Sequence, residues 1–367
     1  MDRVRVGVMG CGVISGIYIE NMLKYKPLDV IACGDLDINR ARAAAERHGI
    51  AKAQTVEQML DDSEIEIVVD LTVPNAHAVV NDQILAAGKH VYTEKPFATV
   101  KASAKRTMDL AKEMGLLIGC APDSFLGAAH QTCRQLIDEG LIGIPLGAHS
   151  FMLGHGPEHW VPLPHAYYQK GTGPLLDMAP YYISAFVNLL GPIRRVTSSA
   201  RITRPERVIP SGPRKGEVIK VETPTHVVAI LDFESGPVCQ LTTSSDIWEH
   251  RLPYIELYGS EGTLIIPDPN QYDGPIEFRG PNSSEWRPIK SDLPFGVNSR
   301  GVGIMDMAYA IRTGRPHRAS GALGFHAVEV MESILDASEL GRHVDIESHV
   351  SRPEPLPASA TELDLGS

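Results

Sequence analysis

Short apolar runs alternate with amphipathic stretches over the first third of the chain. The apolar runs show no regular polar alternation, which is typical of parallel strands that are buried on both faces. We expect strands at 4–9, 30–34, 65–71, 90–93 and 116–120, and helices at 15–23, 39–48, 76–87 and 100–114. Strands that alternate with helices in this way predict a doubly wound α/β domain, a Rossmann dinucleotide-binding domain over residues 1–122.

The pattern changes after residue 122. Strand-like runs separated by turn residues fill the stretch 195–289, which predicts an open, predominantly antiparallel β-sheet. Apolar helical patterns at 128–139, 175–190, 303–313 and 323–340 flank this stretch. We therefore expect an α+β domain for substrate binding and oligomerisation over residues 123–348. Residues 349–367 are rich in Pro, Ser and acids without periodicity, and we expect them to form a flexible tail.

Composition narrows the class of protein. The 367 residues carry a net charge of −11, and no charge run is basic, which argues against a nucleic-acid partner. No apolar run approaches the length of a transmembrane helix, and no secretory leader is visible at the N-terminus. The five cysteines show no Cys-x-x-Cys spacing. We expect a soluble cytoplasmic protein without a membrane partner.

A glycine-rich turn follows the first strand and opens the first helix. Gly10 permits a tight turn and Gly12 lets the backbone approach a pyrophosphate, so the turn is expected to bind a dinucleotide. The residues expected to contact it there are Gly10, Cys11, Gly12, Val13 and Ile14. Asp35 ends the second strand, where a carboxylate binds ribose hydroxyls and repels a 2′-phosphate; this favours NAD over NADP. The alternative is that Asp35 and Asp37 only cap the next helix.

Four further motifs carry a family resemblance. They are Thr72-Val73-Pro74-Asn75-Ala76-His77, Glu94-Lys95-Pro96, Gly171-Thr172-Gly173-Pro174-Leu175-Leu176-Asp177 and Gly259-Ser260-Glu261-Gly262-Thr263-Leu264. Together with the domain order, they resemble the Gfo/Idh/MocA family (glucose–fructose oxidoreductase, inositol dehydrogenase and relatives) over residues 3–348. The resemblance implies cofactor contacts from Thr72, Asn75, His77, Glu94 and Lys95. It also implies a catalytic role for Asp177 and an open sheet whose face forms oligomer contacts, hence a homodimer or homotetramer.

One position departs from that family. Its pattern has a histidine four residues after the aspartate, where this chain has Tyr181. The spacing places Asp177 and Tyr181 on one helix face. A phenol with a pKa of about 10 is a poor base at neutral pH, but an adjacent ammonium lowers that pKa. We therefore expect Lys95, Asp177 and Tyr181 to be catalytic, with Lys95 making Tyr181 able to exchange a proton, as in family branches that use tyrosine here.

The loop 154–174 is rich in Gly, Pro, His and aromatic residues. We expect it to line a carbohydrate pocket, with substrate contacts from His155, His159, Trp160, His165 and Tyr168. His155 and His159 have the spacing of a metal pair, but Gly154, Gly156 and Pro157 oppose the helix that would align them, so no metal is expected. His165 is the alternative base. The sequence leaves open whether Trp248 belongs to the pocket or to plain surface.

These observations predict an NAD-dependent oxidoreductase. It would move a hydride between nicotinamide and a secondary hydroxyl or keto group of a sugar, glycoside or inositol-like polyol. Two alternatives remain within the same fold: cleavage of a glycosidic bond through transient redox chemistry, and a non-catalytic NAD or sugar sensor. Intact Lys95 and Asp177 argue for an enzyme, whereas the replacement at Tyr181 argues slightly for a sensor.

Overall fold

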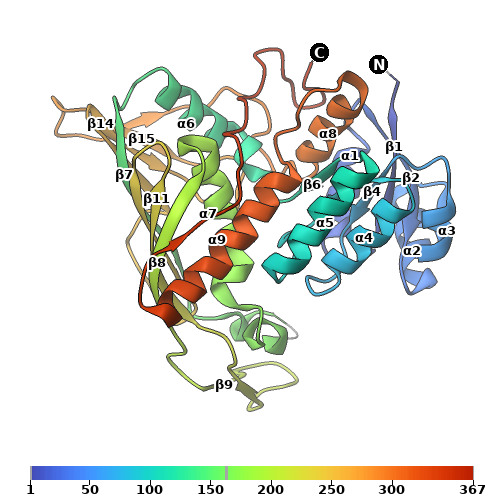
Figure 1. The fold of residues 1–367 in the computed structure, drawn as a ribbon, viewed down its shortest axis with the longest axis horizontal. Coiled ribbons are helices and arrows are strands. Elements are labelled where there is room, and N and C mark those ends of the chain that lie inside the picture. Colours follow the sequence, from blue (N-terminus) through green and yellow to red (C-terminus); the bar gives the residue numbers. More distant parts are fainter. Residues whose placement is uncertain (1, 162–163, 367) are drawn as a thin grey trace.

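The N-terminal part of the chain is a parallel sheet between two layers of helices, as expected (Figure 1). The computed structural model describes residues 2–161 and 164–366. The strand order is β3-β2-β1-β4-β5-β6, and every neighbouring pair is parallel. The strands are β1 (Val4–Met9), β2 (Leu28–Gly34), β3 (Lys52–Gln54), β4 (Ile67–Asp70), β5 (His90–Thr93) and β6 (Ile118–Cys120). The helices are α1 (Ser15–Met22), α2 (Ile38–His48), α3 (Val56–Asp61), α4 (His77–Ala86) and α5 (Lys101–Met114).

The second sheet is mixed but mostly antiparallel, which confirms the predicted fold class. Its nine strands lie in the order β16-β15-β14-β13-β7-β12-β11-β8-β17, and only β12 and β7 pair in parallel. The strands are β7 (Pro145–Leu153), β8 (Ile193–Arg201), β11 (His226–Phe233), β12 (Val238–Ser244), β13 (Ile255–Gly259), β14 (Gly262–Ile266), β15 (Ile276–Arg279), β16 (Arg287–Ile289) and β17 (Val344–Asp345). Four helices accompany it: α6 (Ala128–Asp138), α7 (Gly173–Leu190), α8 (Val302–Thr313) and α9 (Gly321–Leu340).

A smaller excursion lies beside the nine-stranded sheet. Strands β9 (Glu206–Val208) and β10 (Val218–Lys220) form a two-stranded antiparallel ribbon, which we call the arm, residues 202–224. The ribbon projects at one end of the sheet (Figure 1). Three 3-10 turns complete the described elements: η1 (Ser124–Leu126), η2 (Pro157–His159) and η3 (Pro164–Tyr168). Residues 162–163, inside the predicted substrate loop, lie outside the described residues, as do residues 1 and 367 at the ends of the predicted domain and tail.

Helices cover one face of the nine-stranded sheet and leave the other open. α7 and α9 lie between this sheet and the N-terminal domain (Figure 1). Along β11, buried Val227 and Ala229 alternate with Val228 and Ile230, which are 36% and 43% exposed. The alternation shows that one face belongs to the core and the other meets solvent in this chain. Among the described residues, no helix has both the length and the apolar character needed to cross a bilayer.

The C-terminal segment is not the flexible tail that its composition predicts. Leu365 is fully buried, and the backbone N–H of Leu356 donates to Gln131 (2.9 Å). Lys26 donates its backbone N–H to the carbonyl of Leu363 (3.0 Å), which ties the segment to the N-terminal domain. The expectation is wrong because an extended chain can be fixed by such backbone hydrogen bonds without any helical or strand periodicity.

Two buried histidines make the fold sensitive to acid. His326 is fully buried; its Nε2 accepts from the backbone of Ile193 and its Nδ1 faces Ser348 Oγ at 2.8 Å. Burial lowers the pKa of His326, and that of His130, to about 4. The folded state therefore binds protons more weakly than the unfolded state, whose histidines titrate near ~6.5. The stabilisation is complete above ~6.5 and is lost as the pH falls towards 4, by about 2 to 3 kcal/mol per histidine.

We expect His326→Gln, which bonds without titrating, to flatten the fall in unfolding free energy between pH 6.5 and 4. Urea unfolding at each pH measures it. His343→Gln is the matched control, because His343 is exposed. An equally steep fall of the unfolding free energy in His326→Gln and in the control would contradict the role of His326 in the acid sensitivity.

Candidate active site

The glycine turn lies at the carboxyl end of β1 and only glycine fits its first position. Gly10 has a φ of +97°, and a Cβ there would lie 2.7 Å from the carbonyl carbon and oxygen of Leu71. A Cβ at Gly12 would meet no protein atom within 4 Å. Gly10 is thus required by the contact between neighbouring loops, whereas Gly12 borders open space at the start of α1. Such a space is where a pyrophosphate approaches backbone N–H groups.

The two aspartates after β2 have different roles. Asp37 caps α2 by accepting the backbone N–H of Asn39. Asp35 instead faces the glycine turn: its Oδ2 accepts the backbone N–H of Cys11 at 2.8 Å. The capping alternative therefore holds for Asp37 and not for Asp35, which stands where a ribose carboxylate is needed.

Several apolar side chains near this turn are exposed to solvent. Val13, Leu36 and Val73 follow β1, β2 and β4, and they are 106%, 95% and 66% exposed. Large apolar side chains on one edge of a parallel sheet mark a ligand surface. With the open space at Gly12 and the carboxylate of Asp35, the residues present fit a nicotinamide dinucleotide.

The loop after β4 meets the Glu94-Lys95-Pro96 segment through a buried histidine. The ring of His77 is 1% exposed and lies between the carbonyl oxygens of Pro96 (2.7 Å) and Thr72 (3.2 Å). The side chain of His77 thus fixes two loops to each other, and the expected contact of this residue with the cofactor stays a prediction. The hydroxyl of Thr72 donates to Asp70 (2.6 Å), and exposed Asn75 borders a separate cleft.

Lys95 joins the end of β5 to helix α7. Its Nζ donates to the carbonyl oxygen of Asp177 (2.8 Å) and to Asp177 Oδ1 (2.7 Å). Burial lowers the pKa of Lys95, but the negative charges of Asp177 and Glu94 and the hydrogen bond to Asp177 outweigh burial, so its pKa is raised. Lys95 is consequently an ammonium over the whole physiological range.

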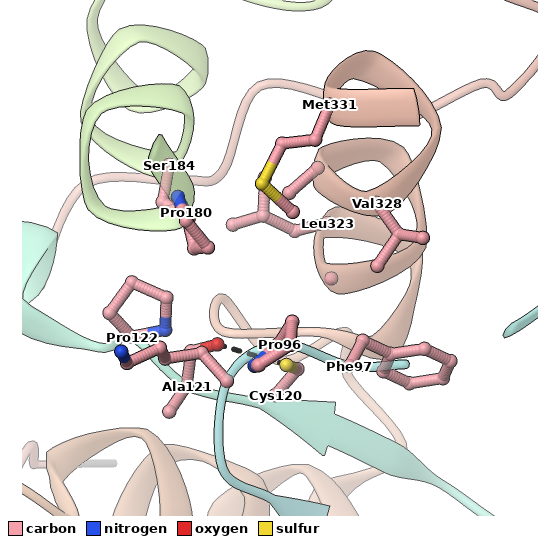
Figure 2. Close-up of a pocket in the computed structure, with 13 residues that line it drawn as sticks. Pro96, Phe97, Cys120, Ala121, Pro122, Pro180, Ser184, Leu323, Val328 and Met331 are labelled. Atoms are coloured by element: carbon pink, nitrogen blue, oxygen red, sulfur yellow. Dashed lines mark hydrogen bonds between the residues drawn. The ribbon is translucent and has the colours of Figure 1, made fainter. Parts of the chain in front are cut away.

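Glu94 and a cluster of mostly apolar residues between the two domains, which we call the apolar joint, hold Lys95 in place. Glu94 accepts from the hydroxyl of Tyr18 (2.7 Å) and from the backbone N–H of Lys95 (2.8 Å). Lys95 lines a small space whose other walls are shown in Figure 2, where the ends of β5 and β6 meet α7 and α9. The labelled residues are Pro96, Phe97, Cys120, Ala121, Pro122, Pro180, Ser184, Leu323, Val328 and Met331. The space between them is about 10 Å³, too small for anything beyond one water.

Tyr181 lies one helical turn after Asp177, with its ring centre 5.3 Å from Lys95 Nζ. Burial raises the pKa of Tyr181; the positive charges of Lys95 and Arg300 lower it, but not enough, and the net shift is upward. The expectation that Lys95 brings this phenol into a useful range for a base is therefore wrong in the structure. Burial dominates because the side chain is only 7% exposed. Tyr181 is therefore a neutral phenol near neutral pH.

Arg300 is a member of this centre that sequence reasoning missed. It directly precedes α8, and its guanidinium donates to Asn270 (2.9 Å) and Asn298 (2.8 Å). Its charge acts on Tyr181 although the two residues are far apart in the chain. No local motif surrounds Arg300, so only the fold could reveal it.

A cleft of about 240 Å³ opens beside Asp177. Its lining comprises Met152, Gly154, His155, Gly156, Pro157, Trp160, Tyr167, Gly173, Pro174, Asp177, Ser244 and Ser245. Two of the expected substrate residues, His155 and Trp160, are in this lining. Tyr167 belongs to the predicted aromatic loop, whereas Ser244 and Ser245 are additions that the sequence did not indicate.

Three other expected substrate residues lie elsewhere. Tyr168 is fully buried and donates its hydroxyl to Glu158, because neighbouring residues of η3 point in different directions and Tyr167 takes the cleft side. His165 Nε2 pairs with Glu217 of the arm at 3.2 Å. His159 lies behind His155, with ring centres 5.2 Å apart. Direct substrate contact by Tyr168 is thus corrected because its side chain is buried, whereas contacts by His159 and His165 stay predictions, although neither residue lines this cleft. Among the described residues, no three His, Cys, Asp or Glu side chains gather as a metal site.

A buried arginine of the arm fixes the walls of the cleft. The side chain of Arg207 is 2% exposed and pairs with Glu158 (2.5 Å) and with Asp246. It also donates to the carbonyl oxygens of His155 (3.0 Å) and Ser245 (2.6 Å). One side chain thereby connects the arm, the substrate loop and the segment after β12.

We expect Arg207→Met to raise KM for the substrate at least about tenfold and to lower stability by about 3 to 5 kcal/mol, because two buried carboxylates lose their partner. NAD affinity should not change, since Arg207 is remote from the glycine turn. Steady-state kinetics, NAD titration and thermal unfolding measure these effects. Arg214→Met is the matched control: it removes an arm arginine whose side chain is 37% exposed. Equal KM values in the two variants would refute the role given to Arg207.

Comparison with known proteins also divides the chain into an NAD-binding Rossmann domain and a C-terminal domain. Residues 4–121 match the model of an oxidoreductase family with an NAD-binding Rossmann fold, and residues 130–265 match the GFO/IDH/MocA C-terminal domain. The two models together cover more than two thirds of the chain.

Two curated relatives are carbohydrate reductases. A dTDP-3,4-didehydro-2,6-dideoxy-alpha-D-glucose 3-reductase from Actinomadura kijaniata is 33% identical over 52% of this chain and 57% of its own length. A 1,5-anhydro-D-fructose reductase from Ensifer adhaerens is 29% identical over 47% and 53%. The chain thus spans slightly more than half the length of these relatives. A levoglucosan dehydrogenase solved with NADH and levoglucosan has a TM-score of 0.81 at 22% identity, over 95% of this chain and all of that one, which shows a shared fold.

Proposed function

The chain belongs to the Gfo/Idh/MocA family of oxidoreductases, and on that premise we propose that it moves a hydride between NAD and a secondary hydroxyl or keto group of a sugar, glycoside or inositol-like polyol. One observation carries the proposal: the ion pair of Lys95 and Asp177, 2.7 Å apart, connects the dinucleotide sheet to the cleft. The carbohydrate substrates in the names of the two curated relatives support the substrate class.

Bound NAD supplies hydride acceptance and donation, and the protein supplies position and protons. The Lys95 ammonium donates a hydrogen bond to the reacting oxygen and stabilises negative charge there. Asp177 holds Lys95 in place and accepts from a neighbouring substrate hydroxyl. Tyr181, a neutral phenol, donates the proton that a carbonyl oxygen needs when it is reduced. Asp35 favours NAD over NADP, because its carboxylate repels a 2′-phosphate.

The raised pKa values of Lys95 and Tyr181 set the pH dependence of each direction. Reduction uses the protonated groups, so its rate should stay level through neutrality and fall only in alkali. Oxidation uses deprotonated groups, so its rate should climb as the pH rises.

We expect Tyr181→Phe to lower kcat about 100-fold and to flatten the rise of the oxidation rate at alkaline pH. The control is Tyr182→Phe, because the hydroxyl of Tyr182 donates to the backbone carbonyl of Phe151 and not to the site. An unchanged pH profile in Tyr181→Phe would rule out the phenol as the proton-transferring group.

The open face of the nine-stranded sheet is proposed to be covered by a second copy of the chain. Val228, Ile230 and Val238 are exposed on this face, and exposed apolar side chains on a sheet face favour association into a homodimer or homotetramer. Sedimentation equilibrium of the wild type and of Ile230→Lys tests the proposal, which predicts a smaller species for the variant.

The experiment for the proposed function follows reduced-nicotinamide absorbance with NAD or NADP across inositols, aldoses, pentoses, glycosides and their keto forms. Turnover with NAD on one carbohydrate class is the expected result. Calorimetry with NAD accompanies the panel. Firm NAD binding with no turnover on any compound would contradict an oxidoreductase that releases its reduced cofactor.

A further inference from the structure

We propose that the cleft extends onto Trp248, which forms a stacking platform for a second ring, so that the favoured substrates are glycosides or disaccharides. This inference rests on the proposed function and specifies its substrate class. The feature that carries it is an exposed tryptophan that is stacked on a residue of the cleft wall.

Trp248 is open on one side and supported on the other. It is 73% exposed, yet its ring lies nearly parallel to that of His155, with an interplanar angle of 15° and ring centres 3.3 Å apart. His159 approaches the same indole edge-on, with ring centres 6.3 Å apart. One indole face is therefore covered by protein, and the side chain remains widely accessible to a ligand.

The platform continues the wall of the cleft beside Asp177. His155, beneath the indole, lines that cleft, as do Ser244 and Ser245 of the segment that carries Trp248. Trp160, on the same loop as His155, also lines the cleft and is 75% exposed. Aromatic surface thus runs from the catalytic carboxylate outward to the rim.

The backbone under the platform is fixed before any ligand arrives. Gly154 donates its N–H to the carbonyl of Ser244 (2.9 Å), and Ile247 donates to the carbonyl of Gly154 (2.9 Å). Arg207 bonds to the carbonyls of His155 and Ser245 from below. A rigid aromatic surface loses little conformational entropy on binding, which favours a recognition role.

The chemistry of this surface suits a sugar ring or another ring-bearing aglycone. The flat apolar face of an indole packs against the C–H face of a ring, while serines and imidazoles nearby offer hydrogen bonds. The cleft of about 240 Å³ is smaller than the ~300–1,000 Å³ typical of pockets for larger ligands. It therefore suits the reacting ring alone, and a second ring must lie outside it, over Trp248.

The chain has three tryptophans, which permits a binding test that needs no turnover. In a Trp286→Phe background the emission comes from Trp160 and Trp248. Maltose, cellobiose and lactose are titrated against the matching methyl glucosides and galactosides, with NADH present. We expect a two-ring sugar to bind more tightly than its one-ring counterpart and to shift the emission further, and this additional shift to disappear when Trp248→Phe is added.

Kinetics on the sugars that turn over give the second measurement. Trp248→Ala should lower kcat/KM for a two-ring substrate about five- to tenfold, the loss of one stacking contact, and leave one-ring substrates within about twofold. Trp286→Phe, at 37% exposure in a distant turn, should change neither. Equal losses for both substrate sizes, no preference for two rings in either measurement, or a changed oligomer size in Trp248→Ala would overturn the platform. Absence of turnover on every sugar would contradict the proposed function, and the emission titration would still decide the platform.

Discussion

Replacing Lys95 by methionine is expected to lower kcat by about 10³-fold while NAD affinity stays within about threefold of wild type. Methionine keeps an unbranched stem of similar length, so the apolar joint behind residue 95 stays filled (Figure 2). What disappears is the ammonium that bonds to Asp177 at 2.7 Å and that we propose donates a hydrogen bond to the reacting oxygen. Steady-state kinetics with saturating NAD measure kcat, and calorimetry measures NAD affinity.

Lys105→Met is the control for a lost lysine charge. Lys105 lies on α5, where it pairs with Asp109 at 63% side-chain exposure, and its loss should leave both constants unchanged. A Lys95→Met enzyme with more than about a tenth of wild-type kcat would remove Lys95 from the chemistry.

Alanine substitutions at Gly10 and Gly12 should distinguish an effect on the stability of the fold from an effect on NAD binding. At Gly10 the added Cβ meets the Leu71 backbone at 2.7 Å, and the φ of +97° disfavours any side chain. We expect Gly10→Ala to lower Tm by roughly 5 °C or more and to abolish measurable NAD binding, because strain of this kind costs about 1–3 kcal/mol before the clash is counted.

Gly12→Ala is the matched variant, since its Cβ would meet no protein atom within 4 Å. Tm should stay within about 1 °C of wild type, whereas NAD affinity should fall about tenfold or more because the methyl group occupies cofactor space. Thermal unfolding and calorimetry on both variants distinguish the effects. If Gly12→Ala binds NAD as tightly as wild type, the cofactor does not lie over this turn.

The parts of the fold that the sequence predicts are those with a long periodic signal. Buried strands β1, β4 and β5 and the long helices fall close to their expected positions, because uninterrupted apolar runs leave few alternatives. β3 has only three half-buried residues, Lys52–Gln54, too short and polar for any pattern. The C-terminal segment was mistaken for a tail because its order comes from carbonyls bonded to distant side chains, such as Pro353 with Arg134.

The candidate site divides in the same way. Asp35, Lys95 and Asp177 stand in local motifs, the first two just after strands β2 and β5 and the third in helix α7. Arg207 and Arg300 reach the site only through long-range packing, which no local spacing encodes. Tyr167 lines the cleft, whereas Tyr168 is buried. The composition of this short 3-10 turn indicates a pocket, but it does not indicate which of the two rings faces that pocket.

The most direct test of the account follows the hydride itself. A keto sugar that turns over is incubated with NADH carrying two deuterium atoms at nicotinamide C4, and the mass of the alcohol product and its rate of formation are measured. We predict one deuterium on the new carbinol carbon with wild type, and about 10³-fold slower formation of this product with Lys95→Met. An alcohol product without deuterium from the wild-type enzyme would contradict it.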